Sequence, residues 1–511
     1  MKLLRKLIFH RVTFVFLSML IQLAVLTEII IKFNEYFVLF YGISIVGSIL
    51  AVLWILYNNS NPAYKLAWII PILTFPLLGG LFYLFFGGNK LSKRTKRKMQ
   101  SIVTNYNAAL IRNDSIVDSI KLNSKTAANQ SRYIQNYSLF PPCINTFTEY
   151  LTSGEAAFEK LVNELKKAEH FIFLEYFIIT EGLMWNSILD ILVDKVKDGV
   201  DVRIIYDDVG CMFTLPGGYN KKLEELGIKC CVFNPLVPFV SFKLNNRDHR
   251  KIAVIDGVTG FTGGINIADE YINEYEKYGH WKDTAIMLKG KAVWNLTVAY
   301  LSMWDFLKGI DENFDNFKRE LSLSDVPTSD GYIQPFADSP LDNEPVGEIV
   351  YLNLINKASK YVYITTPYLI IGNEMVTALS AAAKGGIDVR IITPHIPDKK
   401  LVHSVTRSYY KPLIESGVKI YEYTPGFIHS KTYVSDDDYG VVGTINMDFR
   451  SLYLHFECGV WMYKNSSILD MKKDFLYTLN ECKEFTMEDI KAVKWYQTLG
   501  RLILRVFAPL M

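Results

Sequence analysis

The sequence lacks the motifs that mark several common enzyme classes. It contains no GxxxxGK[ST] phosphate loop and no GxGxxG dinucleotide fingerprint, so it gives little support for nucleotide chemistry. Its six cysteines form no CxxC pair and no disulfide framework, which favours a reduced catalytic region facing the cytosol. The net charge is only +2, and this balance gives no electrostatic reason to expect a nucleic-acid partner.

Charged residues are also scarce near the start of the chain, where residues 1–88 are predicted to form a membrane anchor. Three apolar stretches, 12–31, 37–56 and 66–86, are each long enough to cross a bilayer, which takes about 20 residues. Basic residues precede the first stretch and a basic cluster at 90–98 follows the third. The positive-inside rule puts both ends in the cytoplasm, whereas three full crossings would separate them.

The third stretch is the one that bends most easily, because helix-breaking residues interrupt it: Pro71, Pro76, Gly79 and Gly80. We therefore predict a multi-pass protein with two full crossings, a bent or re-entrant third segment and a cytoplasmic catalytic part. Residues 89–140 are basic and then polar, and we expect them to form a tether with some helix.

The last segment, 491–511, is amphipathic. Four apolar side chains form a helical stripe with two arginines beside it: Leu499, Leu502, Ile503, Val506, Arg501 and Arg505. Two interpretations remain open at this point. The segment is either a short helix in the headgroup layer of a membrane or a helix packed on the catalytic domain.

Between these segments the sequence repeats as two halves, 141–315 and 316–490. The string Gly-Val-Asp-Val-Arg-Ile-Ile at 199–205 returns as Gly-Ile-Asp-Val-Arg-Ile-Ile at 386–392. In both halves helical periodicity alternates with short β-rich runs such as 171–176, which indicates parallel-type sheets with helices outside. The sequence therefore predicts an internal duplication, with two homologous α/β halves packed as a pseudo-twofold pair.

A second repeated pattern carries the chemistry. One signature appears twice, as His249-x-Lys251-x4-Asp256 and as His429-x-Lys431-x4-Asp436. An asparagine follows each histidine by seventeen residues: Asn266 and Asn446. The histidine and lysine of a copy share one face of a strand, whereas the aspartate falls on the opposite face. The six motif residues are expected to form one catalytic centre, in which the aspartates brace a turn or a salt bridge.

Two imidazoles and two ammonium groups suit an exchange of the ester partner of a phosphate. Histidine, with an unperturbed pKa of about 6.5, attacks phosphorus when neutral and donates a proton when charged. The lysines and asparagines would hold the equatorial oxygens, where transition-state charge gathers. No metal or other cofactor is expected, because the lysines supply the positive charge and are not usual zinc ligands.

A neutral nucleophilic imidazole needs a partner for its other nitrogen, usually a carboxylate. Asp283 and Glu457 each follow an aromatic residue downstream of a motif, at matching places in the two copies. We expect them to orient the imidazoles, and surface carboxylates on strands are the alternative. The other histidines are expected to be structural: His10, His170, His280, His395, His403 and His455.

The doubled HxKxxxxD motif resembles that of the phospholipase D superfamily, and the surrounding residues are similar to those of bacterial cardiolipin synthases. The similar segments are 61–68, 249–251 with 263–266, 366–368, 428–431, and 443–451 with 456–457. The resemblance covers nearly the whole chain apart from residues 99–140. An additional N-terminal apolar stretch is the main departure from the pattern.

This resemblance implies that two phosphatidylglycerols give cardiolipin and glycerol through a phosphohistidine intermediate. It implies a bacterial inner-membrane location, no nucleic-acid partner, His249 as the nucleophile and His429 as the acid, and it does not indicate an oligomeric state. A phospholipase D-type hydrolase and a transferase with another alcohol acceptor stay open, whereas the intact motifs oppose a catalytically dead scaffold. The apolar insertion at 236–244 is either a loop packed on the core or a lip that touches acyl chains.

Overall fold

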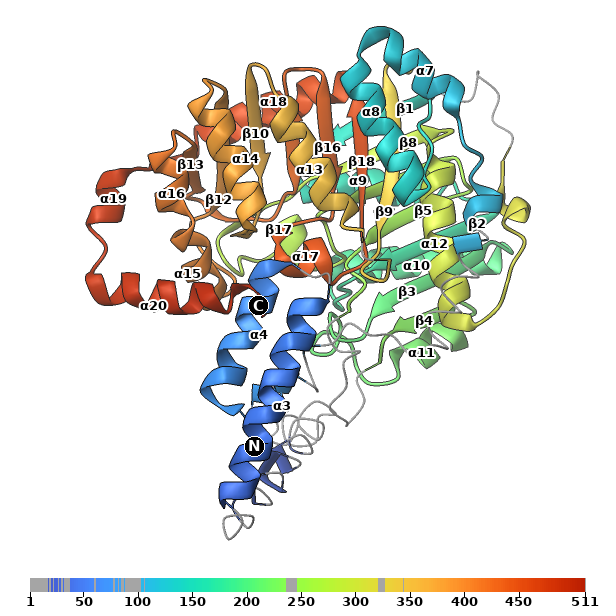
Figure 1. Cartoon of the computed structure of the whole chain (residues 1–511). Coiled ribbons are helices and arrows are strands. Elements are labelled where there is room, and N and C mark those ends of the chain that lie inside the picture. The colour runs from blue at the N-terminus through green and yellow to red at the C-terminus, as the bar shows by residue number, and fades with distance from the viewer. Residues whose placement is uncertain are drawn as a thin grey trace.

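The computed structural model describes residues 37–58, 61–76, 106–235, 246–319, 327–342 and 344–510, together with 17, 20–21, 23–25, 27–28, 31, 79–80, 82–83, 87 and 103–104. In Figure 1 two α/β halves lie side by side, and helices α3 (Phe37–Tyr57) and α4 (Pro62–Thr74) project from them as a stalk. Within this part of the chain no helix has both the length and the hydropathy needed to span a membrane, and most of 12–31 lies outside it.

The third apolar stretch is bent, as its prolines and glycines predict. Helix α4 ends at Thr74, and the chain then returns along it. The rings of Trp68 and Tyr83 lie 5.5 Å apart, and the Tyr64 hydroxyl donates a hydrogen bond to Gly87 O at 3.2 Å. The prediction of a bent segment is therefore confirmed, and the stretch does not run on as one straight helix.

Residues 106–140, within the predicted tether, contain helix as expected and also pack against the catalytic halves. Their helices include α7 (Asp114–Asn123), α8 (Lys125–Tyr133) and the π-helix η2 (Ile134–Ser138). Ile120 and Ile134 are fully buried, and Gln130 Nε2 donates to Val350 O at 3.1 Å. The polar composition is misleading because a few apolar side chains anchor the segment while its buried polar groups find hydrogen-bond partners.

The first half contains a seven-stranded sheet of order β1-β8-β6-β5-β2-β3-β4. Its strands are β1 (Thr146–Leu151), β2 (Phe171–Tyr176), β3 (Asp201–Asp207), β4 (Lys229–Phe233), β5 (Lys251–Ile255), β6 (Thr259–Gly263) and β8 (Ala285–Gly290). The helices and 3-10 turns of this half are α9 (Gly154–Leu165), α10 (Leu183–Lys197), α11 (Tyr219–Glu225), η4 (Asp269–Ile272), α12 (Val293–Lys308) and η5 (Phe314–Phe317). Helix α12 packs on one face of the sheet, while α9 and α10 contribute to a separate core.

The second half repeats this sheet and adds one strand, in the order β19-β13-β12-β10-β15-β16-β18-β9. Its strands are β9 (Tyr332–Asp338), β10 (Tyr361–Thr365), β12 (Asp388–Pro394), β13 (Lys419–Tyr423), β15 (Thr432–Ser435), β16 (Tyr439–Gly443), β18 (Glu457–Tyr463) and β19 (Cys482–Phe485). Its helices are α13 (Val346–Lys357), α14 (Asn373–Lys384), α15 (Lys400–Ser408), α16 (Tyr410–Glu415), α17 (Phe449–Tyr453), α18 (Ser466–Leu479), α19 (Met487–Lys491), α20 (Trp495–Val506) and the 3-10 turn η7 (Ala508–Leu510). The predicted duplication is thus present strand for strand.

Both sheets are mixed, which corrects the expectation of parallel-type sheets. Strands β2, β3 and β4 are parallel, as are β10, β12 and β13. The strand that follows each His-x-Lys runs antiparallel to its neighbours, since β5 turns back into β6 and β15 into β16. This hairpin leaves no signal in the sequence, because its strands are short and buried on both faces and so show no alternation of apolar and polar residues.

The two halves exchange short strands where they meet. Strand β14 (Gly426–Ile428) of the second half pairs in parallel with β7 (His280–Lys282) of the first. At the matching place, Asp248 of the first half forms a parallel bridge with Phe456 of the second. One further pair, β11 (Leu369–Ile370) with β17 (Met447–Asp448), lies within the second half. These exchanges hold the two motifs beside one another.

Candidate active site

The two motifs occupy equivalent places in the two sheets. His249 lies two residues before Lys251, the first residue of β5, and His429 follows β14 directly. Lys431 directly precedes β15. Strands β5 and β15 pair with the central strands β2 and β10, so each motif sits at the middle of its sheet. All four side chains are buried, and both lysines are at most 2% exposed.

Each histidine is held by a carboxylate from the other half of the chain. His249 Nδ1 lies 2.9 Å from Glu457 Oε1, and His429 Nδ1 lies 2.7 Å from Asp283 Oδ2. With Nδ1 bound to a carboxylate, the free Nε2 of each imidazole is the atom available for a substrate. The sequence identifies both carboxylates, but only the paired fold reveals that they are exchanged.

Backbone hydrogen bonds fix these exchanged contacts. His249 N donates to Phe456 O at 2.9 Å, and His429 N donates to Lys282 O at 2.7 Å. Each histidine is therefore aligned, through its own backbone, with the residue that precedes its carboxylate partner. This alignment limits the freedom of the imidazole before any substrate arrives.

The two carboxylates are accommodated in different ways at equivalent turn positions, Gly264 and Thr444. A Cβ atom at Gly264 would lie 2.0 Å from Asp283 Oδ1, so the shorter carboxylate needs the glycine. In the other copy, the Thr444 hydroxyl donates to Glu457 Oε2. The longer carboxylate is thus held by a hydroxyl that the first copy has no room for.

The two lysines are buried and lie close to the histidines of their own motifs. Lys251 Nζ donates to His249 O at 2.6 Å, and Lys431 Nζ donates to His429 O. Burial lowers the pKa of Lys251 to about 8 and that of Lys431 to about 7. The charge of Lys251 also lowers the pKa of Lys431, as expected for two ammonium groups that share one site.

Burial also lowers the pKa values of both imidazoles, to about 4 for His429 and well below the usual range for His249. The pKa values of their carboxylate partners shift in opposite directions. Burial alone would raise the pKa of Asp283, but the charges of His429 and Lys431 hold it below its usual range. Burial does raise the pKa of Glu457 well above that range. Of the two carboxylates, Asp283 is therefore the one whose ionised form the site favours.

The motif aspartates lie apart from this cluster and brace the fold. Asp256 accepts hydrogen bonds from three successive backbone N–H groups at the start of β2, and Asp436 does the same at the start of β10. The donors are the N–H groups of Glu169, His170 and Phe171, and those of Ser359, Lys360 and Tyr361. Both aspartates adopt left-handed φ angles, 52° and 58°. They secure the turn after each motif strand, the bracing role that strand alternation favours.

The two motif asparagines are also buried. Asn266 Oδ1 accepts from Ile178 N at 3.0 Å, and Asn266 Nδ2 donates to the Tyr271 hydroxyl at 2.6 Å. The Tyr271 ring lies 5.6 Å from that of His429, so this tyrosine, which no sequence motif marks, connects the two. Within the described residues Asn446 Oδ1 has no hydrogen-bond partner. Phosphate binding by either asparagine remains a prediction.

The surroundings of the two histidines differ. The ring of His455 lies 5.6 Å from that of His249, and Arg450 Nε lies 3.4 Å from His455 Nε2. His249 also has one aromatic neighbour, Phe177 at 5.0 Å, whereas His429 lies between Trp281 at 5.6 Å and Phe427 at 5.8 Å. One flank of the site is therefore basic and the other apolar. His455 is predicted to be structural from the sequence, because nothing in its spacing links it to the motif.

One group of side chains at the site has the spacing of a metal ligand set. His249, His455 and Glu457 offer ligand atoms that all lie within 4.8 Å of one another. The contact of His249 with Glu457 accounts for part of this proximity. The buried ammonium group of Lys251 disfavours a second cation at the same place. The residues present therefore fit an orienting carboxylate better than a metal centre.

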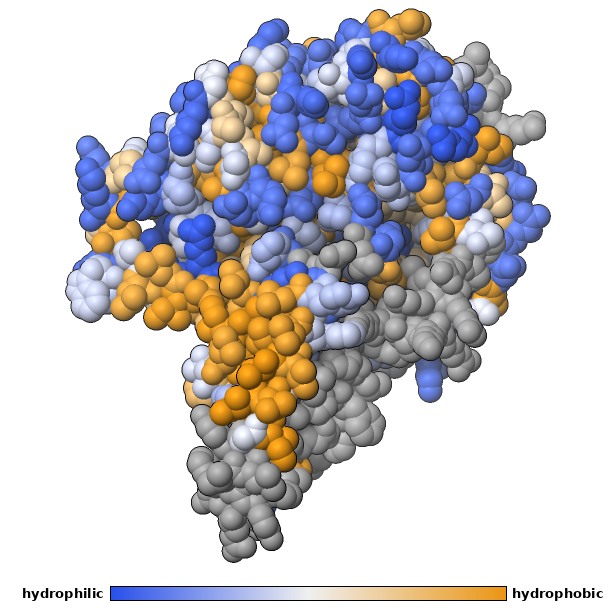
Figure 2. All heavy atoms as spheres, viewed as in Figure 1, coloured by the Kyte–Doolittle hydropathy of each residue, from blue (hydrophilic) through white to orange (hydrophobic). Residues whose placement is uncertain are grey.

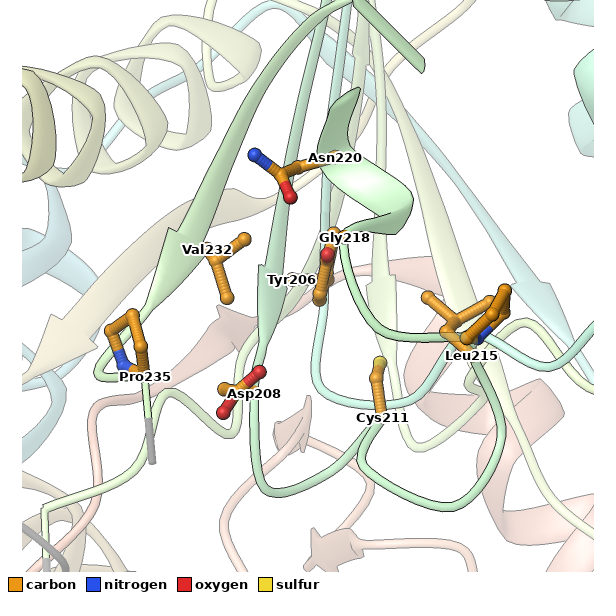
Figure 3. A pocket seen from close by; sticks show the side chains of 9 residues that line it. Tyr206, Asp208, Cys211, Leu215, Gly218, Asn220, Val232 and Pro235 are labelled. Atoms are coloured by element: carbon orange, nitrogen blue, oxygen red, sulfur yellow. The ribbon is translucent and has the colours of Figure 1, made fainter. Parts of the chain in front are cut away.

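A cavity of about 310 Å³ lies at the C-terminal ends of β3 and β4 (Figure 3). Its lining residues are Tyr206, Asp208, Cys211, Leu215, Pro216, Gly218, Asn220, Val232 and Pro235. None of the predicted site residues is among them, so this hollow is not the catalytic centre. The predicted lip at 236–244 follows Pro235 and lies outside the described residues.

Comparison with known proteins agrees with this geometry. Residues 161–291 and 351–479 match the family described as cardiolipin synthase, PLD-like domain. The chain belongs to the cardiolipin synthase family of phospholipase D-like enzymes. Residues 46–88 match a second family, described as phospholipase D-nuclease N-terminal, so the stalk carries a recognised module as well.

Relatives of this family cover nearly the whole chain. A cardiolipin synthase of Alkalihalophilus pseudofirmus is 35% identical over 465 residues, covering 89% of this chain and 91% of that protein. An uncharacterized protein of Streptococcus mutans is 43% identical over 472 residues, covering 90% of this chain and 99% of that protein. The crystal structure of a phosphatidylserine synthase of Haemophilus influenzae has the same fold, with a TM-score of 0.56 at 16% identity over 75% of this chain and 97% of that one.

The bracing role of Asp256 predicts a loss of stability rather than of chemistry. Asp256→Ala leaves three N–H groups without their acceptor and should lower the free energy of unfolding by about 1–3 kcal/mol. The folded fraction should keep most of its turnover number. Thermal unfolding and activity per folded molecule test this, with Asp190→Ala on the surface of α10 as the control. A full loss of activity in a stably folded Asp256→Ala protein would contradict it.

The lowered lysine pKa values predict how activity depends on pH. A lysine with a lowered pKa is charged below that value and neutral above it, so anion binding should weaken as pH rises through about 7 to 8. Arginine keeps its charge throughout this range. In Lys431→Arg protein that retains activity, the alkaline limb of kcat/KM should therefore move to higher pH. An unchanged limb would show that Lys431 does not set it.

Proposed function

We propose that this protein is a cardiolipin synthase that transfers a phosphatidyl group from one phosphatidylglycerol to the terminal hydroxyl of another. The observation that carries the proposal is the pair of buried imidazoles, each held through Nδ1 by a carboxylate of the opposite half. Such a pair suits two successive displacements at one phosphorus. The exchange of one phosphodiester for another needs no ATP, because the bonds broken and formed are alike.

In the first step His249 Nε2 attacks the phosphorus of the donor lipid. The P–N bond forms as the bond to the headgroup oxygen breaks, and His429 gives its proton to the departing glycerol. Lys251 and Lys431 stabilise the equatorial oxygens as negative charge gathers on them. The products of this step are free glycerol and a phosphatidyl group on His249.

The different surroundings of the imidazoles support these roles. The neutral form of His249 is favoured by burial and by the charge of Lys251, and a neutral imidazole is the nucleophile. His429 faces the ionised Asp283, and the anionic phosphodiester adds negative charge as it binds. Both effects stabilise a proton on His429, so this residue serves as the acid.

In the second step the hydroxyl of a second phosphatidylglycerol loses its proton to neutral His429 and attacks the phosphohistidine. The P–N bond breaks, cardiolipin forms, and both histidines return to their starting states. Water competes for the same intermediate. The apolar flank formed by Trp281 and Phe427 beside His429 would favour a lipid hydroxyl over water.

One assay separates this function from its alternatives. Purified protein is added to phosphatidylglycerol vesicles, and lipids and glycerol are measured over time. Cardiolipin with an equal amount of free glycerol is expected, and His249→Ala and His429→Ala should each reduce both by at least about 1000-fold. Phosphatidic acid without cardiolipin would indicate a hydrolase. A transferase with another acceptor would form cardiolipin slowly and a different phospholipid rapidly when that alcohol is supplied.

The proposal includes a location in the bacterial inner membrane. The apolar stretches predicted at 12–31 and 37–56 would cross it, while the stretch at 66–86 bends back and keeps both ends on the cytoplasmic side. The sequence supports this with basic residues on both flanks, and the contact of Trp68 with Tyr83 supports the bend.

Cysteines introduced at Asn59 and Asn89 report on this topology in intact cells. Both should react with a membrane-impermeant maleimide only after the cells are opened, because two crossings return the chain to the cytoplasm. A cysteine-free background keeps native cysteines silent. Labelling of the Asn89→Cys protein from outside would contradict the arrangement and favour three crossings.

A further inference from the structure

Helix α20 presents an unusual combination of a packed face and an exposed apolar face. Its inner side contacts α15, where Arg505 Nη1 donates to Ser408 O at 3.3 Å and the Arg505 guanidinium lies 4.2 Å from the Tyr409 ring centroid. Its outer side carries exposed apolar residues at helical spacing: Trp495, Leu499, Leu502, Ile503 and Val506. The interpretation that this segment packs on the catalytic domain is thus confirmed for one face of α20, and the membrane interpretation stays a prediction for the other face.

The exposed face of α20 continues onto the stalk. Helix α20 contacts α4, and the turn η7 that follows it contacts α4 and α17. Leu510 of this turn packs against the cluster of Ile55, Trp68 and Ile72 on the stalk. In Figure 2 the apolar surface runs without interruption from α20 onto α4 and α3. Exposed apolar residues of α4 and of its C-cap extend this surface: Leu66, Ile70 and Leu73 in the helix, and Phe75 directly after it.

The charged residues of α20 itself are all basic. Helix α20 contains no acidic residue, while Lys491 and Lys494 precede it and Arg501 lies within it. An apolar stripe with an aromatic residue at one end and basic residues beside it is typical of helices that lie in the headgroup layer of anionic membranes. The bend between this stripe and the stalk is visible in Figure 1, where α20 runs across the base of the second half.

We propose that α20 docks on an anionic phospholipid bilayer, with Leu499, Leu502 and Ile503 inserted beneath the headgroups. The stalk would enter the same bilayer, so two elements at an angle to each other fix how the catalytic halves sit on its surface. This surface is separate from the catalytic residues, and it rests on the proposed membrane location but not on the identity of the lipid reaction.

Contacts between neighbouring elements connect α20 and the stalk to the active site. Helix α20 packs on α15. In α15, Thr406 Oγ1 accepts a hydrogen bond from Leu369 N at 3.3 Å. Leu369 lies in β11, whose partner β17 begins directly after Asn446. On the stalk side, Asn61 Nδ2 donates to the Tyr453 hydroxyl at 3.0 Å in α17, the helix that carries Arg450. Docking of α20 and the stalk would therefore hold the basic flank of the site near the lipid headgroups.

The test compares a paired substitution with a matched control in the full-length chain. Leu502→Glu with Ile503→Glu puts charge on the docking face, while Leu469→Glu with Leu476→Glu changes two exposed leucines of α18, away from α20. Cardiolipin formation is measured in phosphatidylglycerol vesicles and in detergent micelles. The rate of the α20 variant should fall at least about tenfold in vesicles and less than about twofold in micelles. The rate of the control variant should stay unchanged in both.

A second measurement does not depend on activity, so it tests the proposal even if the doubly substituted protein fails to fold. A bimane probe on Leu502→Cys protein, in a cysteine-free background, should be quenched by nitroxide lipids in vesicles, and the same probe on Leu469→Cys protein should not. Equal vesicle rates for the α20 variant and the unaltered chain would overturn the proposal. So would a Leu502 probe that is shielded by a second copy of the chain and not quenched by lipid. If the unaltered chain makes no cardiolipin while the probe is still quenched, the proposed reaction fails and the docking surface stands.

Discussion

The structure depends on one constraint, the exchange of orienting carboxylates between the two halves. Asp283 of the first half binds His429 of the second, and Glu457 of the second half binds His249 of the first. Neither half can build a complete site alone, because each supplies an imidazole without its partner. Short parallel strand pairings at the junction place these groups, and one apolar core runs through both halves behind them.

Duplication supplies two similar displacement sites, and small departures from symmetry let them differ in role. Gly264 admits the shorter carboxylate, whereas Thr444 holds the longer one with its hydroxyl. A basic flank with His455 lies beside His249, and an aromatic flank with Trp281 lies beside His429. In the proposed ping-pong transfer one imidazole carries a phosphatidyl group while the other carries a proton, and these departures would separate the two tasks.

The sequence predicts the duplication, the two halves and the motif residues because each leaves a local pattern that occurs twice. The Asp256 position on the opposite strand face was likewise readable from spacing. The antiparallel part of each sheet could not be predicted. The short strands around Ala253 and Phe261 are buried on both faces, so apolar and polar residues do not alternate along them. The packed helices before residue 140 and the neighbours Tyr271 and His455 depend on tertiary contacts that no local pattern encodes.

The most direct measurement of this account is the site of the covalent intermediate. Protein mixed with phosphatidylglycerol is quenched in alkali within one turnover, digested, and analysed by mass spectrometry for a phosphatidyl group on histidine. The account predicts the adduct on the peptide that contains His249, and no adduct in the His249→Ala protein. Absence of any histidine adduct during rapid turnover would contradict the two-step mechanism, and an adduct confined to His429 would reverse the assigned roles.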